Sequence, residues 1–248
     1  MFILLVAKEF KGRNTMAERS MIRTRTGIPG LDELMDGGIP RGNLVVLAGD
    51  PGSGKTCFCL SFLYHGAVDF NEPGIYISLE ESVEDIVRDG IQFGWDIKKL
   101  IQERKLIVET VELYDFDKLK NLIEDSIQVI QAKRLVIDPG VIFRLYFDRE
   151  LDARKRIMSL GKMLKMIDCT TIITNEINLD KTRSLFGLEE YVADGVILLY
   201  HSKIENRFVR SIGILKMRGT KISEKLHPII INNEGIKVLS KQELFEEF

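Results

Sequence analysis

The stretch Gly49-Asp50-Pro51-Gly52-Ser53-Gly54-Lys55-Thr56 decides the fold. It has the G-x-x-x-x-G-K-[ST] spacing of a P-loop, in which backbone N–H groups cradle phosphates. An apolar run, residues 43–48, leads into it, and a helical pattern follows from Lys55 to about Phe70. Glycines let the backbone wrap closely around an anion, and the following helix adds the positive end of its dipole. The stretch therefore predicts a nucleotide-binding loop between a strand and a helix.

Two side chains of this loop have distinct expected roles. The Lys55 ammonium would reach the β- and γ-phosphates, and the Thr56 hydroxyl would ligate Mg²⁺. The candidate nucleotide contacts are Gly49, Asp50, Pro51, Gly52, Ser53, Gly54, Lys55, Thr56 and Cys57.

Composition limits the class of protein. The 248 residues are 45% apolar and 29% charged, with a formal net charge of −2, which suits one large α/β domain and gives no overall attraction to nucleic acid. The three cysteines have no disulfide-framework spacing, so we expect reduced thiols in a cytoplasmic protein. The apolar residues 1–7 are too few to span a membrane.

The order of predicted elements indicates the architecture. Strands and helices alternate up to residue 176, which predicts a mostly parallel sheet flanked by helices, the core of a P-loop NTPase. The remaining strands have no helices between them and should form antiparallel hairpins at the sheet's edge. We divide the chain into an N-terminal extension (1–23), one nucleotide-binding domain (24–240) and a C-terminal tail (241–248).

Acidic residues end two of the predicted strands. Ligands of parallel sheets bind outside the carboxyl ends of the strands. Asp138 ends an apolar run, where a carboxylate orients Mg²⁺, although it could instead cap a turn before Pro139. Glu80 and Glu81 end another run and could accept a proton from an attacking water. Successive strand residues point to opposite faces, so we favour Glu80 and hold Glu81 as its substitute.

A pair of cations alternates along one of the last strands. Lys216 and Arg218 flank Met217 and precede Gly219 and Thr220. Two cations on one side of a strand repel each other unless an anion lies opposite. The alternative is that they lie on a solvated sheet edge.

Taken together, these segments resemble the KaiC-like branch of the RecA superfamily of ATPases. The matching segments run in order over residues 24–240 and are Thr26–Asp32, Gly37–Pro40, the P-loop, Leu79–Glu81, Phe93–Asp96, Leu135–Asp138, Asp194–Val196 and Lys216–Thr220.

The resemblance implies a RecA-like core and subunits assembled in a ring, usually a hexamer, with ATP between neighbours. Lys216, Met217, Arg218 and Thr220 would then contact the neighbour's ATP, which supplies the anion that the two cations need. The glutamate pair would be catalytic together with Lys55, and Gln92 would lie near the ribose or base.

The chain departs from the family pattern at two positions. Pro139 follows Asp138 where Ser is common, and Ile222 stands where many members carry a nucleotide-contacting His. The clock protein of the family has two such domains in tandem, whereas this chain shows one. We therefore transfer neither timekeeping nor autophosphorylation.

The expected function is that of a Mg²⁺-dependent, ring-forming ATPase. A recombinase-like protein that binds single-stranded DNA is an alternative, since cations and aromatic residues follow two of the strands. These residues are Phe143, Arg144, Tyr146, Phe147, Arg149, Arg154, Lys155, Arg156, Lys181 and Arg183. Nearby acids dilute their charge, so nucleic acid is possible but not favoured. A nucleotide-stabilised scaffold and a protein kinase also stay open, with an unknown protein partner.

Overall fold

The computed structural model describes residues 22–111, 116–140, 149–176 and 192–244. Most of the expected N-terminal extension and half of the expected tail lie outside these ranges. In chain order the elements are β1 (Arg23–Thr24), the 3-10 helix η1 (Asp32–Met35), β2 (Ile39–Pro40), β3 (Leu44–Gly49), α3 (Lys55–Asp69), β4 (Gly74–Ser78), α4 (Val83–Gln92), α5 (Ile97–Gln102), β5 (Leu106–Thr110), α6 (Phe116–Ile130), β6 (Arg134–Asp138), α7 (Glu150–Met166), β7 (Thr170–Glu176), β8 (Gly195–Ile204), β9 (Arg207–Met217), β10 (His227–Asn232) and β11 (Gly235–Val238).

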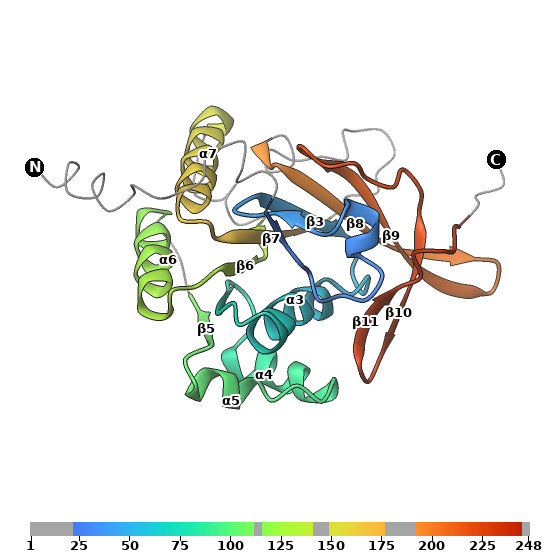
Figure 1. Ribbon diagram of the computed structural model, residues 1–248, viewed down its shortest axis with the longest axis horizontal. Coiled ribbons are helices and arrows are strands. Elements are labelled where there is room, and N and C mark those ends of the chain that lie inside the picture. The colour runs from blue at the N-terminus through green and yellow to red at the C-terminus, as the bar shows by residue number, and fades with distance from the viewer. Residues whose placement is uncertain (1–21, 112–115, 141–148, 177–191, 245–248) are drawn as a thin grey trace, which may run out of the picture.

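A nine-stranded sheet forms the centre of the described chain, in the order β11-β10-β9-β8-β3-β7-β6-β4-β5 (Figure 1). The strands from β8 to β5 pair in parallel, and β9, β10 and β11 continue the sheet in antiparallel pairs. The predicted fold class is confirmed, including the antiparallel strands at the C-terminal edge. The P-loop strand β3 lies in the middle of the sheet, so its polar end is supported on both sides.

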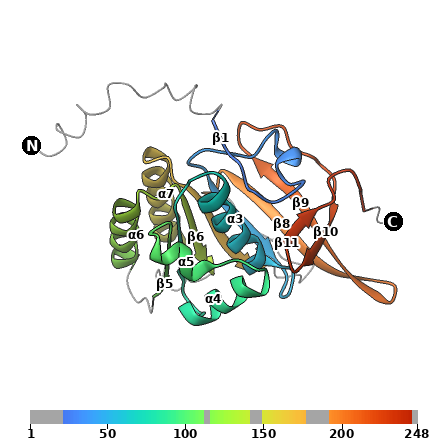
Figure 2. The same ribbon diagram turned by 60° about the horizontal axis from the view of Figure 1, so that its bottom comes forward.

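Helices cover the parallel strands on both faces (Figure 2). Helices α3, α4 and α5 lie on one face, where Phe58, Phe62 and Leu63 of α3 are fully buried in the larger apolar cluster. Helices α6 and α7 lie on the other, where Leu119 and Leu160 pack on a second cluster. Alternate strand residues serve the two clusters, as the pleat of a sheet requires. No helix among the described residues is long and apolar enough to cross a membrane.

A local signal explains the start of α4. Ser82 caps α4 as its spacing to Asp85 predicts, because its hydroxyl accepts from the Asp85 N–H at 3.2 Å. Two features were not anticipated: the short helix α5 and the pairing of β1 with β2. Strand β4 also ends at Ser78, two residues earlier than its sequence suggests.

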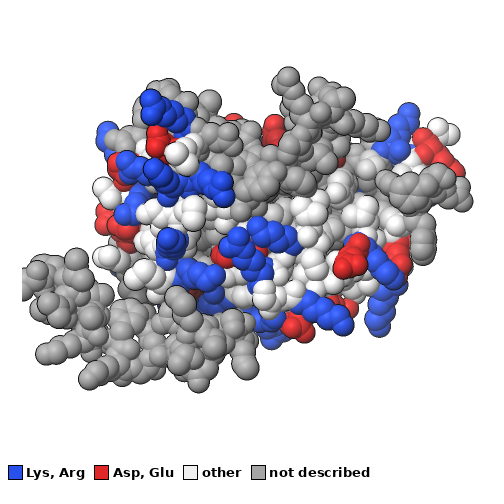
Figure 3. Space-filling view, turned by 90° about the horizontal axis from the view of Figure 1, so that it is seen from above, with Lys and Arg blue, Asp and Glu red and all other residues white. Residues whose placement is uncertain are grey.

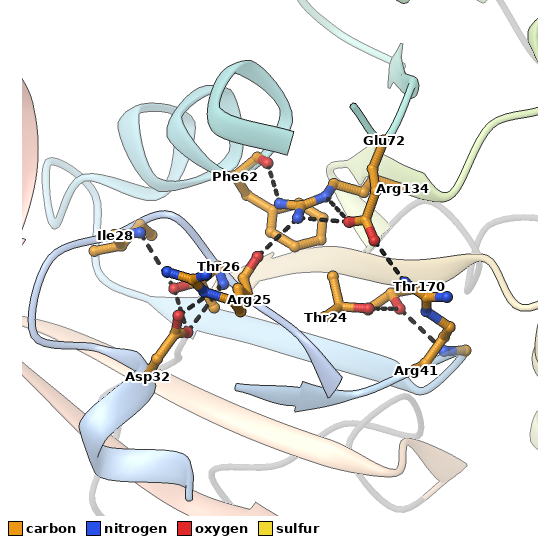
Figure 4. A network of polar contacts seen from close by, with 11 residues as sticks. Thr24, Arg25, Thr26, Ile28, Asp32, Arg41, Phe62, Glu72, Arg134 and Thr170 are labelled. Carbon is orange, nitrogen blue, oxygen red and sulfur yellow. Dashed lines mark hydrogen bonds and ion pairs between the residues drawn. The ribbon is translucent and has the colours of Figure 1, made fainter. Parts of the chain in front are cut away.

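A fully buried arginine ties the N-terminal segment to the sheet and to α3 (Figure 4). The Arg134 guanidinium donates to Glu72 Oε2 at 2.6 and 2.9 Å, to the Phe62 carbonyl at 2.7 Å and to the Arg25 carbonyl at 2.8 Å. It also stacks over the Phe62 ring at 4.6 Å. The guanidinium presses so closely on α3 that a Cβ at Gly66 would lie 2.4 Å from its side chain. All of these contacts are lost if the cation is removed.

The same network extends to the segments on both sides of β2. Glu72 also pairs with Arg41 at 2.7 Å, and the Thr24 and Thr170 hydroxyls are 2.7 Å apart. The Asp32 carboxylate accepts from the Thr26 N–H at 2.9 Å, while burial raises the Asp32 pKa. These contacts fix residues 24–43 against the N-terminal ends of the parallel strands.

An aromatic cluster lies on the face of the sheet that α3 covers. Trp95, the only tryptophan of the chain, stacks on Tyr64 with ring centroids 5.2 Å apart and packs on Phe93 at 5.0 Å. The tryptophan is 5% exposed. The cluster joins α3 to the end of α4.

Replacement of Arg134 by Met should lower the free energy of unfolding by about 3–5 kcal/mol, because it removes a fully buried cation and leaves the partly buried Glu72 carboxylate with fewer partners. Urea denaturation followed by circular dichroism measures the change. The matched control is Arg88→Ala, which breaks the exposed pair with Asp85. Equal midpoints for the two variants would show that Arg134 does not hold the fold.

Candidate functional site

The P-loop joins the carboxyl end of β3 to the first turn of α3. Gly52 and Gly54 adopt φ angles of 74° and 103°, a region that favours glycine. Gly54 is the N-cap of α3 and gives it no side-chain cap. The first N–H groups of α3 therefore face the loop uncapped by a side chain, as an anion site at a helix start needs.

The polar side chains of the loop also fit a bound phosphate. The Lys55 ammonium donates to the carbonyls of Gly49 at 2.9 Å and Asp50 at 3.2 Å, so it lies over the loop. Among the described residues, the buried side-chain oxygens without a hydrogen-bond partner are Asp50 Oδ1 and Ser53 Oγ. Both belong to this loop, and buried polar atoms are rarely left unpaired. Their clustering marks the loop as a place built for a polar ligand.

A pocket of about 300 Å³ opens beside the loop. Gln92, predicted to lie near the ribose or base, lines it together with Cys57 and Phe93. Arg210 of β9 lines it too, and its Nε donates to the Gly52 carbonyl at 2.9 Å. We did not predict Arg210, because it is 158 residues from Gly52 in an ordinary strand pattern. No local sequence signal identifies it.

Asp138 lies at the carboxyl end of β6, as predicted. Its carboxylate accepts hydrogen bonds from the Tyr76 hydroxyl at 2.5 Å and from the Thr174 hydroxyl. Burial, and then the nearby Asp138 charge, raise the Cys59 pKa well above its ordinary value, while Lys55 lowers it. Asp138 therefore lies within electrostatic reach of the first turns of α3, where Thr56 also sits. This arrangement suits Mg²⁺, which usually takes one or two carboxylates and completes its shell with phosphates and water.

The two glutamates lie beyond the strand and not in it. Because β4 ends at Ser78, the alternation that made us favour Glu80 does not extend to these residues, and the premise of that choice is wrong. The Glu81 N–H donates to Ser78 Oγ at 2.8 Å. Burial, followed by the Asp138 charge, raises the Glu81 pKa. Glu81 is thus the glutamate that lies on the Asp138 side.

The predicted cation pair lies on β9 and just after it. The Lys216 ammonium donates to the Ala193 carbonyl at 2.6 Å, and Arg218 pairs with the Asp194 carboxylate at 3.4 Å. Burial, and then Arg218, lower the Lys216 pKa.

The neighbours of these cations make contacts within their own chain. The side chain of Met217 is buried in the core, and the Thr220 hydroxyl accepts from Arg23 at 2.7 Å. Ile222, the second departure from the family pattern, packs on the larger core cluster.

The sheet places these cations and the P-loop at opposite ends. Gly195 pairs with Val45 on one side and with Met217 on the other, so the pair lies level with the start of β3. The P-loop begins at Gly49, the last residue of β3. The four residue steps from Val45 to Gly49, at about 3.3 Å each, put roughly 13 Å between the two groups along the strands. The cations cannot reach the P-loop of their own chain.

A family model described as an ATPase, KaiC, matches residues 24–243. The chain belongs to the KaiC-like family of ATPases. It is 38% identical over 235 residues to a UPF0273 protein of Methanocaldococcus jannaschii, covering 88% of this chain and 96% of that one. It is 33% identical over 236 residues to the circadian clock oscillator protein KaiC of Synechococcus elongatus, covering 91% of this chain but only 46% of KaiC.

The fold of this KaiC-like chain also matches a solved relative. The crystal structure of a KaiC-like protein from Pyrococcus horikoshii aligns with a TM-score of 0.79 at 37% identity, covering 88% of this chain and 98% of that one. The predicted resemblance and fold are confirmed, and the family supports an ATP-binding function. The roles of individual site residues remain predictions.

The thiols of this KaiC-like chain should be unreactive in the native state. All three cysteines are buried, and burial raises the pKa of Cys57 and of Cys169 to about 12. Because the thiolate is the reactive species, Ellman's reagent at pH 8 should modify them slowly before unfolding and completely after it. An exposed thiol introduced by Lys98→Cys serves as the fast control. Rapid native labelling of Cys57 would show that the pocket is open to solvent at its thiol.

Proposed function

We propose that this protein is a Mg²⁺-dependent ATPase that works as a ring, with ATP held between neighbouring subunits. The observation that carries the proposal is the separation of the P-loop from the Lys216 and Arg218 pair on one sheet. Each subunit then presents a phosphate cradle at one end and cations at the other. A second copy, placed head to tail, brings the two together.

Such a head-to-tail contact is heterologous, so repeated copies form either a closed ring or an open filament. We propose the closed ring, with six subunits as the family resemblance implies. This chain spans about half the length of the KaiC of Synechococcus elongatus, covering 46% of it. The number of six subunits is therefore proposed from the family resemblance and not taken from that protein. Buried, reduced thiols suit the cytoplasm, where we place the protein.

The residues of the loop would bind and orient the nucleotide. The first N–H groups of α3 and the Lys55 ammonium would hold the phosphates. Thr56 and Asp138 would hold Mg²⁺, which neutralises phosphate charge when bound. Tyr76 and Thr174 keep the Asp138 carboxylate in place through their hydroxyls.

The rest of the pocket would receive the remainder of the nucleotide. Gln92 and Arg210 line it beside the loop; we assign Gln92 to the ribose or base, and Arg210, which is bonded to the Gly52 carbonyl, to the edge nearer the loop.

The proposed reaction needs an acceptor for the proton of the attacking water. Glu81 is suited to this role, because its raised pKa makes it a stronger base than an ordinary glutamate. Glu80, which is exposed as Glu81 also is, would orient water or act as the substitute. The cations of the next subunit would stabilise charge as the γ-phosphate leaves.

Glu81→Gln should lower kcat by about 10²–10⁴-fold with ATP binding retained, and Glu80→Gln should lower it less. The base works only when deprotonated, and its pKa is raised. Turnover of the wild type should therefore fall as the pH drops, with a midpoint above 4.5, the ordinary value for Glu. Phosphate release as a function of pH measures this. A larger loss in Glu80→Gln than in Glu81→Gln would reverse the assignment.

A mixing experiment tests whether the site is shared. Lys55→Ala should abolish nucleotide binding, and Arg218→Ala should bind nucleotide but turn it over slowly. A mixture of the two variants, dissociated and reassembled, should regain a fraction of the wild-type rate, because some interfaces join an intact P-loop to an intact Arg218. No gain over the separate variants, with rings confirmed by mass, would contradict a site completed in trans.

The alternative functions give different results in the same assays. A scaffold would form rings in ATP without release of phosphate, and a kinase would transfer the γ-phosphate to protein.

Nucleic-acid binding stays a second candidate that we do not favour. The described part of the predicted basic segments lies on and beside α7, and the face drawn in Figure 3 carries many Lys and Arg side chains with fewer acidic ones between them. Arg156 is paired with Asp117 at 2.5 Å. The remaining candidates lie outside the described residues, and these are Phe143, Arg144, Tyr146, Phe147, Lys181 and Arg183.

A further inference from the structure

A charged cluster lies at the end of the sheet opposite the P-loop. Its centre is the carboxylate of Asp194, in the turn before β8. Asp194 Oδ1 lies 3.4 Å from Arg218 Nη1 and also 3.4 Å from Lys165 Nζ. A single oxygen therefore serves two cations that come from different elements, the end of β9 and the end of α7.

The carboxylate is fixed, whereas the two cations are exposed. The Asp194 N–H donates to the Leu44 carbonyl at 2.8 Å, its Oδ2 accepts from the Leu44 N–H at 3.3 Å, and its carbonyl accepts from the Arg218 N–H at 2.9 Å. Its side chain is 15% exposed, against 58% for Arg218 and 50% for Lys165. A change of partner at this site must therefore come from movement of the cations.

The cluster also carries more positive than negative charge. Lys165, Lys216 and Arg218 all interact with Asp194, and each has a long flexible side chain. Lys165 has a second anchor, since its ammonium donates to Asn43 Oδ1 at 3.2 Å. Within the described part of the chain, the Arg218 guanidinium is held by Asp194 alone. Of the two cations on Oδ1, Arg218 is thus the one suited to leave, and Lys165 the one suited to stay.

We propose that Asp194 is the counter-ion that holds Arg218 in the isolated subunit, and that Lys165 is a positioning residue that keeps Asp194 neutralised when Arg218 turns to the neighbour's nucleotide. The ligand that competes with Asp194 is the polyphosphate of that nucleotide. The inference rests on the proposed function, because it needs Arg218 to act across an interface.

The physical basis is competition for one oxygen. With Lys165 present, Asp194 Oδ1 divides its attraction between two cations, which weakens its hold on Arg218. Without Lys165 the same carboxylate has Arg218 as its remaining partner at this oxygen, and the arginine should be released less readily. Replacement of Asp194 by Asn keeps the shape and the acceptor for the Leu44 N–H but removes the charge, so Arg218 should be released more readily.

The test is a double-mutant cycle on the assembled ring, with kcat and KM for ATP read separately. Lys165→Ala should lower kcat about threefold with KM unchanged, because exposed ion pairs are individually weak. Asp194→Asn should raise kcat about twofold, and adding it to Lys165→Ala should restore the rate to at least the wild-type value. Lys165→Arg should behave as the wild type. Lys162→Ala, one turn earlier on α7, is the matched control.

The outcomes separate this inference from the proposed function. If Arg218→Ala leaves turnover unchanged, the trans site itself is wrong. If Arg218→Ala is slow but Lys165→Ala matches Lys162→Ala, only the role of Lys165 is overturned. If Asp194→Asn fails to rescue Lys165→Ala, Lys165 does not act through Asp194, which also overturns the proposal.

Discussion

The buried guanidinium of Arg134 is the interaction on which the arrangement of this molecule most depends. It is enclosed between α3, the sheet and the segment before β3, and its partners come from α3, the turn after it and that segment. A charge in such a position is tolerated only when its donors are paired. The segment from residue 24 to residue 43 is thereby held at the N-terminal ends of the strands, the same end at which Asp194, Lys165 and Arg218 meet.

The parallel direction of the strands then decides which groups a single chain can bring together. All six parallel strands end on the P-loop side, where Glu81, Asp138 and the start of α3 converge. The antiparallel strand β9 runs back to the opposite end of the sheet, so Lys216 and Arg218 at its C-terminal end lie there. A catalytic site that needs both groups is therefore divided by the fold itself. The division follows from topology and does not depend on any flexible segment.

The sequence was sufficient for the fold class and for the position of the P-loop between β3 and α3, because those features are local. The P-loop spacing, the terminal Asp138 and the Ser82 cap each act within a few residues or at a strand end. Arg210 and Arg134 could not be recognised, because their roles depend on residues 158 and 62 positions away. The choice between Glu80 and Glu81 depended on a strand end that shifted by two residues. From the sequence, Asp194 could be recognised only as part of a family segment, because Lys165 and Arg218 come together around its carboxylate only in the folded chain.

The position of Trp95 gives the molecule an internal optical probe. It is the only tryptophan, it packs on Phe93, and Phe93 lines the pocket beside the P-loop. Indole emission responds to the packing and polarity of its surroundings, so any shift of Phe93 on occupation of the pocket would change the intrinsic fluorescence. The protein thus carries a native spectroscopic reporter next to the pocket beside the P-loop, with no label to be attached and no second indole to obscure the signal.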